Sequence, residues 1–121
     1  MVESLKSHRG SSLAKKICES HYIRISNNYN YVSTNADGLT FWINPDASRL
    51  TEDWSIIINN IDERKLYVFF IPANTFNVTN FKTRKNPQLQ LDIQIDISSK
   101  NFEDRRSKIR FAPYKVAELT Y

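Results

Sequence analysis

The sequence predicts an α+β domain, in which an N-terminal helix precedes a mostly antiparallel, curled β-sheet of about five to seven strands with short helical inserts. The first observation is the run from Gln88 to Ile97, which alternates polar and apolar residues without interruption. This alternation is typical of a strand with one face on a core and the other in water, and it favours an antiparallel sheet. The second is the helical spacing of apolar residues at Leu13, Ala14 and Ile17.

Turn-forming residues divide the first half of the chain into a helix, three short strands and a helical turn. Ser11 or Ser12 can cap the helix, and Asn, Gly and Pro residues mark the turns between the other segments. In chain order we predict a helix over 13–20, strands over 22–26, 29–33 and 39–43, turns at 27–28 and 35–38, and a helical turn over 45–50 with Asp46 as its cap.

The two most apolar segments, 54–59 and 66–71, are predicted to be the central strands, because near-continuous apolarity indicates that both faces are covered. A polar hairpin loop joins them. Pro72 ends the second strand and can occupy the first position of a short helix. The rest of the chain is predicted to contain, in order, that helix to about residue 78, a loop over 82–87, the alternating strand over 88–97, an edge strand over 109–111, and a short helix or strand from Pro113.

Composition indicates a folded chain without a membrane partner. The 121 residues are expected to form a single domain, 1–121, with residues 1–10 as a flexible lead-in. Apolar residues make up 40% of the chain, which favours a core over disorder. No apolar run reaches the roughly 18 residues that span a bilayer, and no secretory signal is recognisable. We therefore expect a cytoplasmic protein.

Charge is distributed unevenly, with an acidic middle between basic flanks. Two basic clusters, 82–85 and 105–110, fall where loops or strand edges are predicted, which is where a polyanion could reach them. Clustered Lys and Arg attract phosphates and release counterions, so the leading hypothesis is a nucleic-acid-binding module, with DNA favoured over RNA. The alternative is that these basic clusters bind no ligand and simply form a solvated face of the domain. The residues expected to contact phosphates are Lys82, Arg84, Lys85, Arg105, Arg106, Lys108 and Arg110.

Pro45-Asp46 followed by Glu63-Arg64-Lys65 resembles the PD…(D/E)xK motif of the restriction-endonuclease-like nucleases, over about twenty residues. The resemblance implies an accessory or recognition part of a restriction or mobile-element system. Its alternative implication is a nuclease, in which Asp46 or Asp53 holds Mg²⁺ with Glu63, and Lys65 positions or activates the attacking water. The predicted hairpin places these acids at opposite ends, roughly 20 Å apart, whereas Mg²⁺ ligands lie about 2.1 Å from the ion. Outside this alternative the sequence implies no cofactor.

Other residues carry weaker signals. Cys18 is the single cysteine and is expected to be a buried structural thiol, with a Cys-His nucleophile using His21 as the alternative. The acidic middle and apolar hairpin leave a third hypothesis open, a non-catalytic protein-interaction domain or homo-oligomer. Aromatic residues on the early strands can either stack on bases or belong to the core; these are Tyr22, Tyr29, Tyr31 and Trp42.

Overall fold

The computed structural model describes residues 10–33, 39–85 and 88–121, so residues 1–9 of the predicted lead-in and the turn at 35–38 lie outside it. Within the described residues the chain forms one α-helix, three short 3-10 helices and nine strands in three sheets, which confirms the α+β class. The elements are α2 (Ser11–Ser20), β1 (Tyr29–Val32), β2 (Thr40–Ile43), η1 (Ala47–Thr51), β3 (Trp54–Asn60), β4 (Lys65–Ile71), η2 (Val78–Asn80), β5 (Thr83–Lys85), β6 (Leu89–Leu91), β7 (Ile93–Asp96), β8 (Glu103–Asp104), η3 (Ala112–Tyr114) and β9 (Lys115–Thr120).

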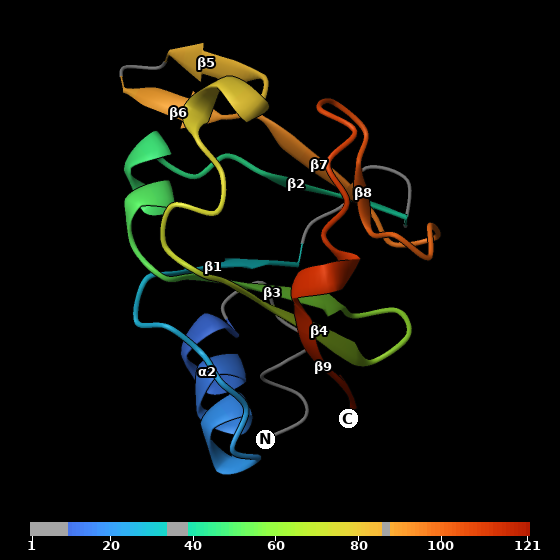
Figure 1. Cartoon of the computed structure of the whole chain (residues 1–121). Coiled ribbons are helices and arrows are strands. Elements are labelled where there is room, and N and C mark those ends of the chain that lie inside the picture. The colour runs from blue at the N-terminus through green and yellow to red at the C-terminus, as the bar shows by residue number, and fades with distance from the viewer. Residues whose placement is uncertain (1–9, 34–38, 86–87) are drawn as a thin grey trace.

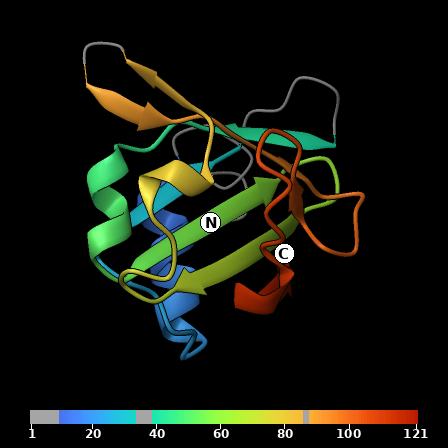
Figure 2. The same ribbon diagram turned by 45° about the horizontal axis from the view of Figure 1, so that its top comes forward.

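The elements form three layers (Figure 1). A four-stranded sheet in the order β1-β3-β4-β9 lies between helix α2 on one side and a three-stranded sheet, β2-β7-β8, on the other. Strands β5 and β6 form a separate two-stranded ribbon. Both ribbon views place it at the end of the molecule opposite α2 (Figures 1 and 2). Within the described residues, the three sheets do not close into a barrel.

Strands β3 and β4 are central, as the sequence predicts, because each has a core on both faces. On one face Ile57 and Val68 pack with the buried Ala14 and Cys18 of α2. On the other, Ile56 and Phe69 are among the residues that pack with buried residues of the three-stranded sheet. All seven residues of β3 are buried, and this explains the apolar run.

Helix α2 ends in a Schellman motif that carries a tyrosine where glycine is usual. The backbone N–H of Ile23 donates to the carbonyl of Cys18 at 3.0 Å, and that of Tyr22 donates to Glu19 at 3.0 Å. Tyr22 has a φ of 58°, in the left-handed region. The predicted helix and the burial of Cys18 are confirmed, and burial raises the pKa of the Cys18 thiol to about 11.

The alternating run is divided between two sheets. Leu91, Ile93 and Ile95 are fully buried, so the predicted facing is confirmed for them, whereas Leu89 at the start of the run is 38% exposed. However, β6 pairs with β5 while β7 pairs with β2, and the division falls at Asp92. The Asp92 N–H donates to the carbonyl of Lys82 at 2.8 Å, which extends the β5–β6 register by one position before the pairing of β7 with β2 begins.

Several predicted boundaries are wrong. Residues 22–26 form no strand, because β1 takes the edge of β3 in a parallel pairing and the Ser26 N–H donates to the Ser55 hydroxyl. The helix predicted after Pro72 forms later, as η2, where Asn77 caps the Thr79 N–H. Residues 109–111 contribute only an isolated bridge between Arg110 and Glu103.

The strand count exceeds the predicted range because short pairings add to it. The predicted loop over 82–87 contains strand β5, and the 103–104 segment pairs with β7. Asp46 precedes η1 as predicted, but its side chain makes no capping hydrogen bond. Among the described residues, no helix has the length and apolarity that crossing a membrane requires.

Candidate nucleic-acid interface

The β5–β6 ribbon presents the first basic cluster. All three residues of β5 are exposed, as is Lys82 before it. On β6, Leu91 is fully buried and its N–H donates to the carbonyl of Pro45 at 2.8 Å. The ribbon is therefore fixed at its base and exposes Arg84 and Lys85 at its outer end.

The second basic cluster lies on the 105–110 loop, which is organised by the buried carboxylate of Asp104. One oxygen of this carboxylate accepts the backbone N–H of Arg106 at 3.0 Å, and the other accepts the Ser107 hydroxyl at 2.6 Å. The ends of the loop are joined where the Phe111 N–H donates to the Phe102 carbonyl at 3.1 Å. The side chains of Arg105, Arg106, Lys108 and Arg110 are exposed on this loop.

Asp92 connects the two clusters. Its backbone N–H donates to the carbonyl of Lys82, and its carboxylate pairs with the Arg106 guanidinium at 3.3 Å. The structure therefore brings the end of the first cluster beside the second. We call the seven residues together the basic surface: Lys82, Arg84, Lys85, Arg105, Arg106, Lys108 and Arg110.

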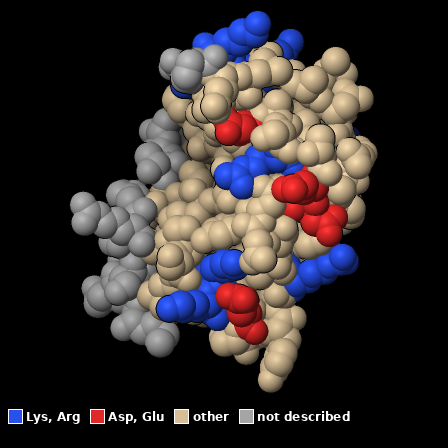
Figure 3. All heavy atoms as spheres, turned by 90° about the vertical axis from the view of Figure 1, so that its left-hand side faces the viewer, with Lys and Arg blue, Asp and Glu red and all other residues tan. Residues whose placement is uncertain are grey.

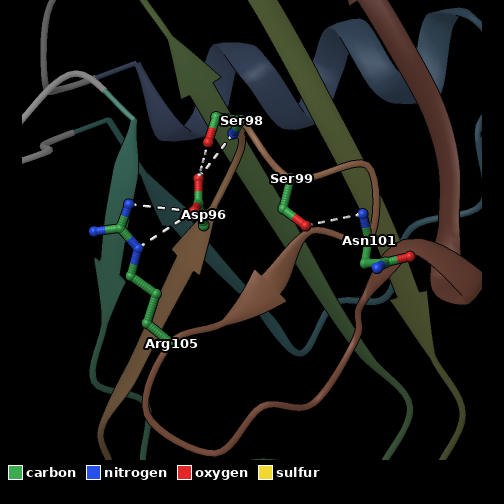
Figure 4. Close-up of polar contacts among 5 residues, drawn as sticks. All are labelled: Asp96, Ser98, Ser99, Asn101 and Arg105. Carbon is green, nitrogen blue, oxygen red and sulfur yellow. Dashed lines mark hydrogen bonds and ion pairs between the residues drawn. The ribbon is translucent and has the colours of Figure 1, made fainter.

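Asp96 makes the second ion pair of this region, with Arg105 (Figure 4). Its carboxylate accepts the Arg105 Nε at 3.3 Å and Nη2 at 3.2 Å, and it also accepts the hydroxyl and N–H of Ser98. Partial burial acts to raise the pKa of Asp96, but the hydrogen bonds from Ser98 and the charge of Arg105 outweigh it and lower that pKa.

Most of the basic surface carries uncompensated charge. Within the described part of the chain, ion pairs engage two of its seven residues, Arg105 and Arg106. Figure 3 shows Lys and Arg side chains gathered at the ribbon end, while acidic and basic groups alternate over the rest of that face. An anion approaching the ribbon end would therefore meet positive charge first.

The residues of the nuclease alternative are not brought together. Asp53 precedes Trp54, which pairs with Ile71, whereas Glu63 and Lys65 lie at the turn of the same seven-residue hairpin. At about 3.3 Å per residue this separation is roughly 20 Å. Asp53 instead accepts the backbone N–H of Ala73.

Asp46 lies apart from Glu63 as well. It lines a polar pocket of about 350 Å³ beside η1. Glu52 also lines this pocket, and so does Arg49, which donates a hydrogen bond to the side chain of Asn28. Among the described residues, no group of three His, Cys, Asp or Glu side chains could hold a metal ion.

The structure separates the aromatic candidates into two kinds. Tyr29 and Tyr31 are partly buried and hydrogen-bonded through their hydroxyls, to Ser11 and Asn59, so they belong to the core. Tyr22 and Trp42 are exposed by 97% and 53%. Trp42 lies on β2, in the sheet that carries the second basic cluster, whereas Tyr22 lies at the end of α2.

Sequence reasoning missed the acids that organise this region. Asp92 and Asp96 are polar residues of the alternating run, whose polar face is predicted to lie in water, but each pairs with an arginine from the 105–110 loop. A local signal exists for Asp104, because Asp followed by a polar turn commonly bonds the backbone N–H two residues later. The arginine partners of Asp92 and Asp96 lie in a later loop, so local pattern does not indicate them.

No family model, curated protein or solved structure matches this chain.

Proposed function

We propose that the chain is a nucleic-acid-binding module that holds phosphate groups on the basic surface. The observation that carries this proposal is the connection through Asp92, which contacts Lys82 by its backbone and Arg106 by its carboxylate. Through Asp92, Lys82 of the first cluster lies near Arg106 of the second, which supports a single binding surface made of both clusters. A contiguous group of cations is the usual electrostatic footprint of a nucleic-acid binder.

The acids nearby leave this surface net positive. There are four such acids for seven cations: Asp104 is buried and engaged with the loop backbone, Asp92 and Asp96 each pair with one arginine, and Glu103 is partly buried. The two paired arginines expose more than 40% of their side chains. Exposed ion pairs contribute only about 0–1 kcal/mol, so a phosphate can replace the carboxylate at small cost.

The test is a binding titration in which charge is removed from the ribbon. Labelled double-stranded DNA, single-stranded DNA and RNA are titrated with the chain between about 50 and 200 mM salt. The double change Arg84→Gln and Lys85→Gln is expected to weaken binding. Log affinity falls as log salt rises, and in this variant the negative slope should become shallower by about two, because two phosphate contacts are lost.

The matched control is Lys15→Gln with Lys16→Gln, which removes the same charge from α2, at the opposite end of the molecule (Figure 1). This variant is expected to bind as the unchanged chain does. Equal weakening in both variants would mean that only net charge matters and would contradict the proposed surface. So would binding that survives the simultaneous change of all seven residues of the basic surface to Ala in a folded chain.

A further inference from the structure

An exposed tryptophan lies on the outer face of the β2-β7-β8 sheet. Phe41 and Ile43, its neighbours on β2, are buried in the core, so Trp42 points the other way and is 53% exposed. Its partner directly across the sheet is Gln94. Side chains of such a cross-strand pair share one face, so Trp42 and Gln94 together form an apolar surface edged by an amide.

Arginine side chains lie on both sides of this pair along β7. Asp92 and Asp96 are two residues before and after Gln94, so they project on the same face. Asp92 pairs with Arg106, and Asp96 pairs with Arg105. In addition, the Arg105 N–H donates to the Gln94 carbonyl at 2.9 Å, which fixes the start of the arginine-bearing loop beside the Trp42 pair.

We propose that Trp42 stacks on an unpaired base and that the ligand of the basic surface is therefore single-stranded nucleic acid, a proposal that rests on the function proposed above. A single strand offers both a phosphate backbone, for the arginines, and open base faces, for the indole ring. A duplex keeps its base faces stacked inside and presents groove edges and phosphates, so it gives an exposed indole no partner.

Charge complementarity decides between this ligand and a protein partner. An exposed tryptophan is also common at protein interfaces, but the cross-strand partner of Trp42 is the polar Gln94, and the loop that carries Arg105 and Arg106 pairs with the acids on either side of Gln94. Trp42 thus supplies an apolar contact where the surrounding surface attracts phosphate. Stacking and phosphate contacts together are the combination by which single-strand binders hold their ligand.

The experiment separates base contacts from phosphate contacts. A short labelled thymidine oligonucleotide is compared with an abasic strand that has the same number of phosphates. The unchanged chain is expected to prefer the strand with bases, and Trp42→Ala to lose that preference, with affinity falling about 5- to 100-fold. Trp42→Phe keeps a ring and should retain much of the preference. Tyr22→Ala, which removes an exposed aromatic just after the C-cap of α2 and away from the three-stranded sheet, should leave it unchanged.

Fluorescence gives a second readout. The chain has two tryptophans, and Trp54 is fully buried, so quenching on binding should come from Trp42 and be absent in Trp42→Phe. Equal binding of both strands, or an unchanged preference in Trp42→Ala, overturns the stacking while the proposed function stands. Absence of binding at low salt overturns both. Self-association that Trp42→Ala abolishes, without any preference for bases, assigns Trp42 to a protein contact and also overturns the stacking.

Discussion

The carboxylate of Asp104 accepts the backbone N–H of Gln94 at 2.9 Å, which joins the start of the 105–110 loop to the neighbouring strand β7. The same oxygen accepts the N–H of Arg106, and Asp104 is fully buried. A buried acid with several backbone donors holds the loop in one conformation. The position of the second basic cluster therefore depends on a residue that is not itself part of the basic surface.

Changing Asp104 to Ala is expected to lower the free energy of unfolding by about 2–4 kcal/mol. The change leaves the N–H groups of Gln94 and Arg106 without their acceptor, and hydrogen bonds to charged groups contribute about 1.5–3 kcal/mol each. Urea unfolding measures the loss. Glu103→Ala, at the neighbouring and partly exposed position, should cost less than about 1 kcal/mol. A similarly small effect for Asp104→Ala would show that the carboxylate does not hold the loop.

Asp92 is expected to weaken nucleic-acid binding, because its carboxylate competes with phosphate for Arg106. Asp92→Asn should therefore tighten binding about two- to fivefold at low salt, as the removal of an exposed ion pair allows. The gain should shrink as salt rises. Anisotropy titration of the same labelled strand measures both effects.

The control for this change is Asp62→Asn in the exposed β3–β4 turn, which removes one negative charge from a turn that carries none of the residues of the basic surface. It should leave affinity nearly unchanged. Weaker binding in Asp92→Asn would instead mean that the carboxylate positions Arg106 for the ligand, and the competition argument would then fail.

Asp96 should make stability depend on pH in the acid range. Burial alone would raise its pKa, but Ser98 and Arg105 hold it below the usual aspartate value of about 3.9. The ionised form is favoured in the folded chain, so its contribution is complete above the ordinary pKa and is lost as pH falls through the lowered one.

Asp96→Asn should accordingly be less stable than the unchanged chain at neutral pH, and the difference should disappear as pH falls well below about 4. Urea unfolding of both chains over this pH range measures it. Ser98→Ala is expected to lose less stability than Asp96→Asn at neutral pH, because the ion pair with Arg105 remains. This smaller loss should also disappear as pH falls. If the stability difference between Asp96→Asn and the unchanged chain stays constant across the pH range, packing, and not the charge of Asp96, accounts for the loss.

The facing of most side chains could be predicted from local pattern, whereas the pairing of strands could not. Alternation correctly placed Ile93 and Ile95 in the core, and continuous apolarity correctly made β3 and β4 central. The parallel pairing of β1 with β3 depends on contacts between segments far apart in the chain. So does the division at Asp92, where the run leaves its pairing with β5 and begins its pairing with β2.

In the candidate site, too, local pattern predicts which residues are exposed but not which residues come together. The exposure of Lys82, Arg84 and Lys85 could be predicted, because charged residues between strands remain in water. Their approach to the 105–110 loop could not, since it depends on Asp92 and Asp104, whose partners are set by the folded chain. Four aromatic candidates were equivalent in sequence, and only their exposure distinguishes Trp42 and Tyr22 from the others.

Tyr22 gives a prediction about stability that involves no contact of its side chain. Its φ of 58° is costly for any residue other than glycine, by roughly 1–2 kcal/mol, and its side chain is 97% exposed. Tyr22→Gly relieves that cost but adds about 0.5–1 kcal/mol of chain entropy to be lost on folding. The expected net effect is a gain of up to about 1 kcal/mol in the free energy of unfolding, measured in urea. Tyr22→Ala keeps the costly backbone conformation and should give no gain; equal stabilities of the Gly and Ala variants would show that the left-handed conformation carries no cost here.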